Sequence, residues 1–407
     1  MSAADLEVDV CIVGGGPAGS SLATRLARAG HDVLVLERAP AWRWHACGVF
    51  TSPAAVMALR RLGLPDATIE AVARPIPAMQ VEVPGAAPFR LTYGAEDSGA
   101  RAAVGFDRQQ LDRHLLDGAR SGGARVEAGW TVTSVILANP RGASQVVARG
   151  PDGAQREILA RLVVGADGIR SLVAREAGVA RPAPLGHRVG LTFHVVDPRP
   201  AGPIDARMVV LDGAYCGLAP VPGGRLNIGI VLTARERLAQ LAASGAGETA
   251  RDVLRRVERR GEPDWATAEA CDSPAGAAPL GHRVARRAGP GWLLVGDAAG
   301  FLDPFTGEGL NRSLVSAELA AGAIDDHLRR GTPLATYERR MRGRFGAKDA
   351  VTLVVQAFLG RPALFRYAAR RLASRAPVRE TMGLVIGDLA PASRAFDPRF
   401  LARLLAP

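Results

Sequence analysis

The chain has 407 residues, enough for two or three domains or for one large α/β unit with an inserted sheet. Hydrophobic residues make up 48% and charged residues 22% of it, which is a normal globular balance. The formal net charge is +11, but no basic run is interleaved with aromatic residues, so we expect no nucleic-acid partner.

The four cysteines, Cys11, Cys47, Cys216 and Cys271, form no C-x-x-C pair and indicate neither a metal site nor a disulfide framework. We expect reduced thiols and a cytoplasmic location. The N-terminus lacks the pattern of a secretory signal, and no apolar run reaches the length of a membrane-spanning helix. We therefore expect a protein that at most touches a membrane surface.

The first predicted elements form a β-α-β unit. Residues 7–13 are short, β-branched and followed by glycines, as in a buried parallel strand. Residues 17–29 have helical spacing up to Gly30, and residues 32–37 predict a second strand.

Helices and strands alternate less regularly after this unit. The next predicted elements are a helix over 53–62, antiparallel strands within 75–93, a helix over 107–120 with Asp107 as N-cap, a hairpin over 125–137 and 144–149, and a buried strand over 161–166. Four short strands between 185 and 232 predict a second, mostly antiparallel sheet. The last predicted elements are a helix over 247–260, a buried strand over 292–297, a helix over 309–330 and an arginine-rich helical region over 334–375.

A glycine motif, G-x-G-x-x-G over residues 14–19, lies directly between the first strand and the first helix. Gly14 permits the tight turn, Gly16 lets the backbone approach a pyrophosphate, and Gly19 lets the helix pack closely. The helix N-terminus then offers N–H groups and a positive dipole end to phosphates. We also assign Pro17 and Ala18, which open the helix, to this site.

Glu37 closes the second strand, 18 positions beyond Gly19, where a carboxylate accepts hydrogen bonds from ribose hydroxyls and repels a 2′-phosphate. The following Arg38 is assigned to the same site. Because NAD and FAD share this fingerprint, the first motif alone does not choose between them.

Two later motifs make that choice. Gly-Ala-Asp-Gly-Ile-Arg-Ser stands at 165–171 and GDAAGFLDPFTGEGLN at 296–311, each directly after a buried strand. Both place an aspartate, Asp167 and Asp297, at the carboxyl end of a strand, where α/β proteins bind ligands. The second motif ends in a glycine-rich turn whose N–H groups suit a negatively charged flavin edge.

With these three motifs in this order, nearly the whole chain resembles the superfamily of para-hydroxybenzoate hydroxylase (the class A flavoprotein monooxygenases) and the geranylgeranyl reductases. The resemblance implies FAD as cofactor. It implies that Gly296 and Asp297 bind the ribityl chain, and that Asp167 and Gly168 lie near the pyrophosphate and the nicotinamide approach. It also implies that Arg108 contacts the FAD phosphates or ribityl chain. The residues that would line the isoalloxazine are Pro304, Gly307, Gly309, Leu310 and Asn311.

The implied fold is α/β, with a Rossmann-like FAD-binding domain of the glutathione-reductase type, an inserted and mostly antiparallel substrate sheet, and C-terminal helices. The predicted boundaries are 1–74, 101–180 and 281–335 for the FAD-binding domain, 75–100 and 181–280 for the substrate domain, and 336–407 for the helical region. No second G-x-G-x-x-G occurs, so NADPH or NADH would dock transiently as electron donor, or an electron-transfer partner would replace it.

Our first expectation for the reaction is a single-component monooxygenase. It would use O2 and a flavin C4a-hydroperoxide to hydroxylate or epoxidise a hydrophobic or aromatic small molecule, in secondary metabolism. Many relatives with this activity carry a histidine where this chain has Gly300, and this difference counts against the monooxygenase reading. The substrate pocket would lie between the flavin ring and the sheet of residues 185–232.

The alternative is an alkene reductase that transfers hydride, as geranylgeranyl reductases do. GDAAGF at 296–301 and Cys47-Gly48, which would lie beside the flavin ring, resemble that branch. Its Tyr-x-Trp-x-Phe-Pro-like strand matches here at Tyr215 and Pro220, whereas Gly217 and Ala219 replace the two aromatics and would widen the pocket.

Two further readings are weaker. Flavin-dependent halogenation needs a lysine, and the chain's one lysine is Lys348 in the C-terminal helices; Trp42 and Trp44 do not continue as W-x-W-x-I-P. A flavin-binding protein without turnover is the non-enzymatic alternative.

The candidate catalytic residues are Tyr215, Cys47 and His45. For Glu308, in the flavin-facing turn, the two alternatives are a catalytic base and a cap of the following helix, and we expect the cap. The amphipathic stretch 361–375 packs on its own protein or makes peripheral contact with a membrane.

Overall fold

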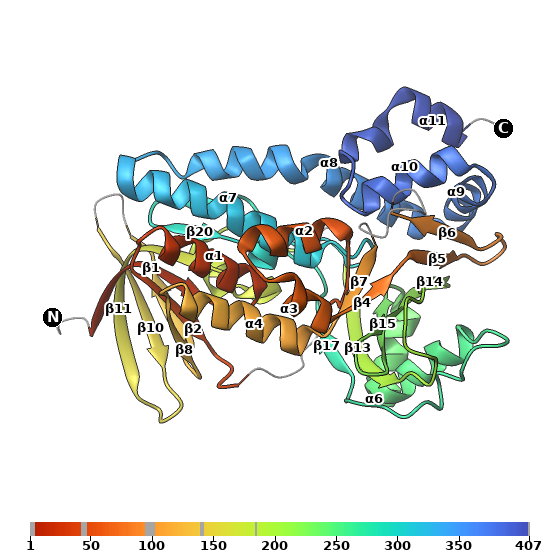
Figure 1. The fold of residues 1–407 in the computed structure, drawn as a ribbon, viewed down its shortest axis with the longest axis horizontal. Helices are drawn as coiled ribbons and strands as arrows, with labels where there is room; N and C mark the ends of the chain where they lie inside the picture. The colour runs from red at the N-terminus through yellow and green to blue at the C-terminus, as the bar shows by residue number, and fades with distance from the viewer. Residues whose placement is uncertain (1–4, 42–46, 94–101, 139–141, 184, 406–407) are drawn as a thin grey trace.

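The computed structural model describes residues 5–41, 47–93, 102–138, 142–183 and 185–405. Its fold class is the predicted one: a mostly parallel sheet with helices, a second sheet, and a helical C-terminal region (Figure 1). His45, Trp42 and Trp44 lie outside the described residues.

The first sheet has the strand order β19-β20-β11-β1-β2-β8. These strands are β1 (Leu6–Val13), β2 (Val33–Glu37), β8 (Arg125–Ala128), β11 (Gln155–Gly165), β19 (Ala288–Gly289) and β20 (Trp292–Leu294). All neighbours pair in parallel except β19 and β20. The glycine turn therefore follows the central strand β1, and the two aspartate motifs follow β11 and β20, at the same edge of the sheet.

The predicted hairpin over 125–137 and 144–149 is partly wrong. β9 (Thr131–Ile136) and β10 (Ser144–Arg149) do form a hairpin, and β10 also pairs with β11. Residues 125–128, however, form the parallel edge strand β8 beside β2. Gly129, with a φ of +83°, ends β8 and lets the chain turn into β9.

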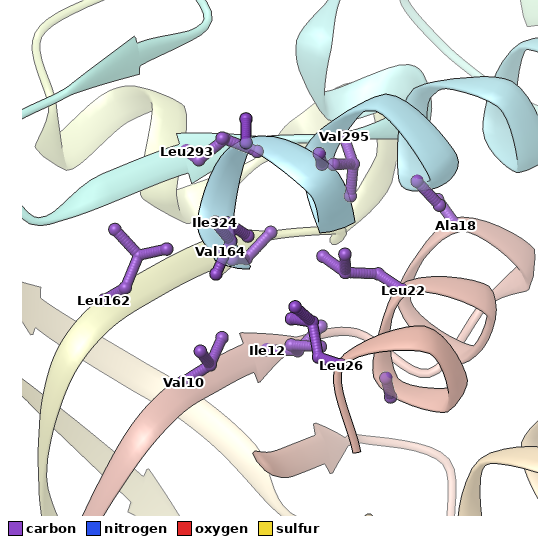
Figure 2. Close-up of a cluster of buried hydrophobic side chains, with 14 of the residues drawn as sticks. Val10, Ile12, Ala18, Leu22, Leu26, Leu162, Val164, Leu293, Val295 and Ile324 are labelled. Carbon is purple, nitrogen blue, oxygen red and sulfur yellow. The ribbon is translucent and has the colours of Figure 1, made fainter. Parts of the chain in front are cut away.

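Beside the first sheet, helix α1 (Pro17–Arg28) packs against both α4 (Arg108–Ser121) and α7 (Gly309–Arg330). The core between α1, α7 and the strands is aliphatic, and Figure 2 shows its side chains pointing toward one another. The labelled residues are Val10, Ile12, Ala18, Leu22, Leu26, Leu162, Val164, Leu293, Val295 and Ile324. Since both faces of β1 and β2 are buried, these strands are nearly continuous hydrophobic runs.

The second sheet has the order β17-β13-β16-β15-β14-β5-β6. Its strands are β5 (Ala78–Glu82), β6 (Phe89–Thr92), β13 (Val189–Val196), β14 (Ala206–Leu211), β15 (Ala214–Val221), β16 (Arg225–Leu232) and β17 (Ala275–Ala277). All pairs are antiparallel except β14 with β5. The sheet thus joins strands from two separate stretches of the chain.

Helix α6 (Arg235–Arg256) packs on one face of this sheet, and its backbone leaves the helical conformation at Gly245. It begins earlier than the predicted helix over 247–260 and ends earlier as well. The opposite face of the sheet, with Tyr215, Ala219 and Val221, packs against the turn before α7 and the C-terminal helices.

A third, small sheet packs against strand β15 of the second sheet. It consists of β3 (Phe50–Thr51), β4 (Ala73–Ile76) and β7 (Ala103–Phe106). A Cβ on Gly105 would lie 2.0 Å from the carbonyl oxygen of Pro220, so glycine is required where β7 crosses β15.

The C-terminal region consists of α8 (Ala335–Leu359), α9 (Pro362–Ser374), α10 (Ala376–Ile386) and α11 (Pro398–Leu405). Helix α8 runs beside α7 and leads to α9 and α10, which pack against β6, and to α11, which packs on α9 and α10 (Figure 1). The remaining short elements are α2 (Pro53–Leu62), α3 (Asp66–Ala71), α5 (Leu172–Glu176), β12 (Ala180–Arg181) and β18 (Arg283–Val284). Among the described residues, none of the helices combines the length and apolar character needed to cross a membrane.

Candidate functional site

The glycine turn shows a different physical requirement at each glycine. Gly14 has a φ of +103°, and a Cβ there would lie 2.6 Å from the carbonyl oxygen of Ala166. A Cβ on Gly19 would lie 1.9 Å from the carbonyl oxygen of Gly14. A Cβ on Gly16 would meet nothing within 4 Å, and no side chain caps the N-terminus of α1. Open space therefore lies in front of the N–H groups that we predict to bind the pyrophosphate.

Glu37 lies beside this turn, as the sequence predicts. Its Oε2 accepts a hydrogen bond from the Gly15 N–H at 2.7 Å, and its Oε1 accepts one from Ala39 at 2.8 Å. Each carboxylate oxygen keeps a further lone pair for a ribose hydroxyl. Arg38 is exposed.

The second motif directly contacts the first, because the Cβ position of Gly14 is 3.2 Å from the Cα of Asp167. Asp167 Oδ2 accepts a hydrogen bond from the Leu172 N–H at 2.6 Å, whereas its Oδ1 is buried without a partner. Burial raises the pKa of Asp167, although hydrogen bonds from Ser171 and Leu172 oppose the shift. Gly168 has a φ of +75°, which suits glycine at this turn.

The third motif also meets the first. Gly296 has a φ of +58°, and a Cβ there would lie 2.7 Å from the Cβ of Ala18. Asp297 follows in a short 3-10 helix, and its Oδ1 is buried without a partner. Burial raises the pKa of Asp297 to about 6, against the opposing charges of Arg312 and Arg108.

The turn before α7 leaves several polar atoms unpaired. Asn311 is 2% exposed, and its Oδ1 has no hydrogen-bond partner. The hydroxyls of Thr306 and Thr51 are likewise buried and unpaired. Gly307 has a φ of +64°, and a Cβ there would lie 2.4 Å from the Phe50 ring.

Two expectations for this turn need correction or narrowing. Glu308 does not cap α7, since its carboxylate lies 3.6 Å from Arg312 and 3.7 Å from the Lys348 ammonium group instead. The N-terminus of α7 therefore has no side-chain cap and can receive a ligand. The side chain of Leu310 packs in a core cluster with α2 and α4, so only its backbone can line the flavin ring, next to Pro304 and Gly309.

Arg108 is buried and already engaged. Its Nε and Nη2 donate to the Asp112 carboxylate, each at 2.9 Å, and its Nη1 donates to the Gly48 carbonyl at 2.7 Å. Burial disfavours the charged guanidinium, but Asp112 outweighs this effect and raises the pKa of Arg108. Arg108 thus holds the Cys47-Gly48 backbone in place, and two of its N–H donors remain for a ligand.

Cys47 lies near the same charged groups. Burial raises the pKa of Cys47 to about 12; Arg108 opposes this shift, and Asp112 and Asp297 add to it. The thiol is therefore neutral at physiological pH and is a weaker acid than an exposed cysteine. Arg108 thus holds the backbone next to Cys47, and Asp297 lies close enough to Cys47 and Arg108 for its charge to raise the pKa of each.

Tyr215 is tied to the turn before α7. Its hydroxyl donates to Asp303 Oδ1 at 2.6 Å, and its ring meets the Phe305 ring edge-on with centroids 5.1 Å apart. Asp303 also accepts a hydrogen bond from Arg188 at 2.8 Å, and Arg188 donates to Gln356 of α8. Because the Tyr215 proton is already used, this side chain fixes the sheet to the turn.

Sequence reasoning missed Asp303, Arg188 and Gln356. Asp303 stands within the third motif, which is the one signal that could have marked it. His282 was also missed; it is buried, with Nε2 3.2 Å from the Ala298 carbonyl oxygen, and burial lowers its pKa.

The residues of the three motifs fit FAD. The uncapped N-termini of α1 and α7 suit negative charge, at the pyrophosphate and at the flavin ring. A buried polar atom without a partner is costly unless a ligand or water satisfies it. The unpaired atoms in this region are Asp167 Oδ1, Asp297 Oδ1, Asn311 Oδ1, Thr306 Oγ1 and Thr51 Oγ1. They suit the hydroxyl and N–H groups of this cofactor.

Comparison with known proteins agrees with this fit. The sequence model of the FAD binding domain matches residues 7–348. The menaquinone reductase of Mycolicibacterium smegmatis is 31% identical over 373 residues, which is 86% of each chain. The digeranylgeranylglycerophospholipid reductase 2 of Methanothermobacter thermautotrophicus is 30% identical over 356 residues, 84% of this chain and 85% of that protein.

A solved flavoprotein/dehydrogenase from Cytophaga hutchinsonii has the same fold, with a TM-score of 0.83 and 19% identity over 96% of this chain and 95% of that one. The FAD binding domain match, the glycine turn and the two aspartate motifs thus agree on one cofactor. The chain belongs to the FAD binding domain family and is an FAD-dependent oxidoreductase.

Proposed function

We propose that this flavoenzyme is a reductase that adds hydrogen to a carbon–carbon double bond of an isoprenoid-bearing lipid. Two sequence relatives that match over most of their length carry the names menaquinone reductase and digeranylgeranylglycerophospholipid reductase. Their names support the reductase alternative over our first expectation, the monooxygenase.

The observation that carries the proposal is the match to these two reductases over more than four fifths of each chain, and Cys47, next to the Gly48 carbonyl that Arg108 holds, is the candidate proton donor. Reduction of a double bond requires a hydride, which bound FAD supplies when reduced, and a proton for the other carbon. Cys47 is half-buried and carries its proton at physiological pH, and we assign its Sγ–H as the donor of that proton to a carbanion-like carbon, a base strong enough to take it from a weakly acidic thiol. Hydroxylation requires no such acid from the protein.

The side chains around the expected substrate position are mostly apolar. The face of the second sheet that carries Tyr215 and Ala219 packs toward Phe305, Phe365 and Met382. Met208 also covers Gly217, because a Cβ on Gly217 would lie 3.5 Å from the Met208 Cε. The flexible Met208 side chain thus occupies part of the space that an aromatic residue at position 217 would fill. An apolar lining of this kind suits an isoprenoid chain.

The test is anaerobic turnover followed by mass spectrometry of the product. The enzyme is incubated with NADH, NADPH or dithionite and either a polyprenyl quinone or a geranylgeranyl lipid. We expect a product that has gained two hydrogens. Incorporation of 18O into the product after 18O2 is admitted would refute the reductase and support the monooxygenase. No product with any of the three reductants, before or after 18O2 is admitted, would favour a flavin-binding protein without turnover.

Cys47→Ala tests the assigned acid. We expect at least a tenfold loss of turnover, with FAD binding unchanged, because only the proton donor is removed. Cys216→Ala is the matched control, since Cys216 is buried on the α6 side of the second sheet. Equal activity of the two variants would rule out Cys47 as the acid.

Faster flavin bleaching by NADPH or by NADH would identify the transient donor.

We also propose that the C-terminal helices meet an anionic membrane surface, where a lipid substrate would be found. Residues 361–405 contain nine arginines against Glu380, Asp388 and Asp397. Within the described part of the chain, eight of these arginines have no carboxylate within ion-pair distance: Arg361, Arg366, Arg370, Arg371, Arg379, Arg394, Arg399 and Arg403. Exposed apolar side chains accompany them, namely Leu364, Phe396 and Leu405. Arginines without a carboxylate partner, beside apolar groups, suit anionic lipid headgroups.

Sedimentation with vesicles tests this surface. Wild-type protein is expected to bind vesicles that contain phosphatidylglycerol and not vesicles of phosphatidylcholine alone. The Arg366→Gln/Arg370→Gln/Arg371→Gln variant should lose most of this binding. Arg251→Gln/Arg255→Gln/Arg256→Gln on α6 removes the same charge from exposed arginines elsewhere and should retain it. Equal binding of the two variants would disprove the assignment.

A further inference from the structure

The backbone at Asp388 is held in an unusual conformation. Asp388 follows α10 and Gly387, and it is the one non-glycine residue with a positive φ, +58°, in the described part of the chain. This left-handed region is unfavourable for residues with a Cβ, although aspartate tolerates it better than most. Such a conformation persists when the surrounding contacts require it.

The Asp388 side chain joins three parts of the molecule. Its Oδ2 accepts a hydrogen bond from Asn311 Nδ2 at 2.9 Å and from Ser52 Oγ at 3.3 Å. Its Oδ1 lies 2.9 Å from the Lys348 ammonium group. The carboxylate therefore connects α8 and the end of α10 to the first turn of α7 and the start of α2.

Lys348, the single lysine of the chain, has no spare donor. It is 2% exposed and donates to the Val385 and Ile386 carbonyls at 2.8 and 3.1 Å, in addition to its contact with Asp388. It thus anchors the C-terminal end of α10 against α8. This engagement leaves no free ammonium group for halogen transfer and gives Asp388 a fixed position.

The fixed position of Asp388 determines how the Asn311 amide is oriented. Because its Nδ2 donates to Asp388, its amide is held in one orientation, with the carbonyl Oδ1 turned away from Asp388. That Oδ1 is buried and unpaired, in the turn where the flavin ring is expected. An amide oxygen only accepts hydrogen bonds, so it suits a ring N–H, of which oxidised isoalloxazine has one.

We propose that Asp388 is a positioning residue for the cofactor: from the C-terminal helical region it orients the Asn311 amide so that Oδ1 receives a hydrogen bond from the flavin ring. The C-terminal helices thereby contribute to the flavin site without touching the flavin. This inference rests on the proposed role of Asn311 as a ring contact. It does not depend on which substrate the enzyme reduces.

Asp388→Asn is the sharpest test, because it keeps the shape and removes the charge. The carbonyl of the new amide would face Lys348, so its nitrogen would face Asn311 and force that side chain to turn over. A donor would then replace the acceptor in front of the flavin ring. We expect FAD to bind about tenfold more weakly, with a changed visible absorption spectrum and flavin potential. Glu380→Gln, at an exposed position of the preceding helix α10, is the control and should change none of these.

The Asp388→Asn/Asn311→Asp double variant exchanges the two groups. The new amide at position 388 then donates to the new carboxylate at position 311, which again presents an acceptor to the flavin. We expect FAD affinity to return to within about threefold of wild type. The flavin potential should fall below that of wild type, because a carboxylate beside the ring disfavours the extra negative charge of the reduced flavin.

Circular dichroism and thermal melting establish folding before each measurement. Folded Asp388→Asn that matches wild type in FAD affinity, spectrum and potential overturns the proposal. If that variant does not fold, the double variant decides: recovery of affinity supports the proposal and continued weak binding overturns it. If neither folds, Asn311→Ala decides, since unchanged FAD affinity would show that the amide makes no contact with the flavin. None of these readouts requires substrate, so failure of the proposed reaction would not be confused with failure of this inference.

Discussion

Gly16 and Gly19 stand three residues apart in the same turn, yet the structure predicts opposite consequences of adding a methyl group. At Gly19 the new Cβ would lie 1.9 Å from the carbonyl oxygen of Gly14, far inside van der Waals contact. The backbone of the turn or the start of α1 must therefore move, at a cost of about 1–3 kcal/mol in the free energy of unfolding. Gly19→Ala should thus destabilise the protein even without cofactor.

Gly16→Ala should leave the cofactor-free protein unharmed. Gly16 has φ −67° and ψ −177°, which alanine adopts without strain, and its Cβ would meet no atom within 4 Å. Restricting the unfolded chain should even stabilise the fold by up to about 1 kcal/mol. The new methyl group would instead fill the space in front of the α1 N–H groups. Losing one hydrogen bond to a charged phosphate is worth about 1.5–3 kcal/mol, which is roughly a 10- to 150-fold weaker affinity for FAD.

Two assays separate these effects. Thermal melting and urea unfolding of cofactor-free protein report stability, and titration followed by quenching of flavin fluorescence reports FAD affinity. We expect Gly16→Ala to lose affinity at normal stability and Gly19→Ala to lose both. Wild-type FAD affinity in Gly16→Ala would refute the placement of the pyrophosphate in front of α1.

Three further predictions concern buried polar groups. Because the pKa of Asp297 is raised, the folded, cofactor-free protein holds a proton that the unfolded chain releases near pH 4, so the free energy of unfolding should fall as the pH rises from about 4 to above 6. Urea unfolding at several pH values should show this fall in wild type. The same fall in Asp297→Asn would contradict the assignment. Tyr215→Phe removes the hydroxyl that donates to Asp303 and should lower the free energy of unfolding by about 1–3 kcal/mol. Tyr367→Phe loses only an exposed hydrogen bond and should have little effect. Similar losses of stability in both variants would argue against the Tyr215–Asp303 contact. Lys348→Met leaves the buried Asp388 carboxylate without its cation and should lower the free energy of unfolding by about 3–5 kcal/mol. Arg342→Gln, which removes an exposed ion pair, should lower it by less than about 1 kcal/mol. Equal losses of thermal stability in the two variants would contradict the buried network.

Residues that start or end helices made much of the fold predictable from the sequence. Pro53 and Gly63 bound α2 at the predicted residues, and the glycine-rich turn and Gly331 do the same for α7. Proline suits the first helical turn, and the left-handed conformation after a helix favours glycine, so these boundaries depend only on neighbouring residues. The three cofactor motifs could be found for the same reason: each combines a buried strand with the turn that follows it.

The errors arose where one pattern fits two pairings. Residues 125–128 have the alternation of a hairpin strand, but the crossover through α4 places them beside β2. Strand pairing depends on partners far away in the chain, which local alternation does not identify. The role of Glu308 was mistaken for a similar reason, because the cations that draw its carboxylate away from the helix end include Lys348, 40 residues later.

Only the tertiary structure decided how the C-terminal helices relate to the flavin site. Nothing local marks Gln356 or Asp388 as neighbours of the turn before α7, yet one bonds to Arg188 and the other to Asn311. Buried polar groups must find partners wherever the fold brings donors and acceptors together. The sequence by itself therefore determined the cofactor and the turns that hold it, while long-range packing decided which side chains orient those turns.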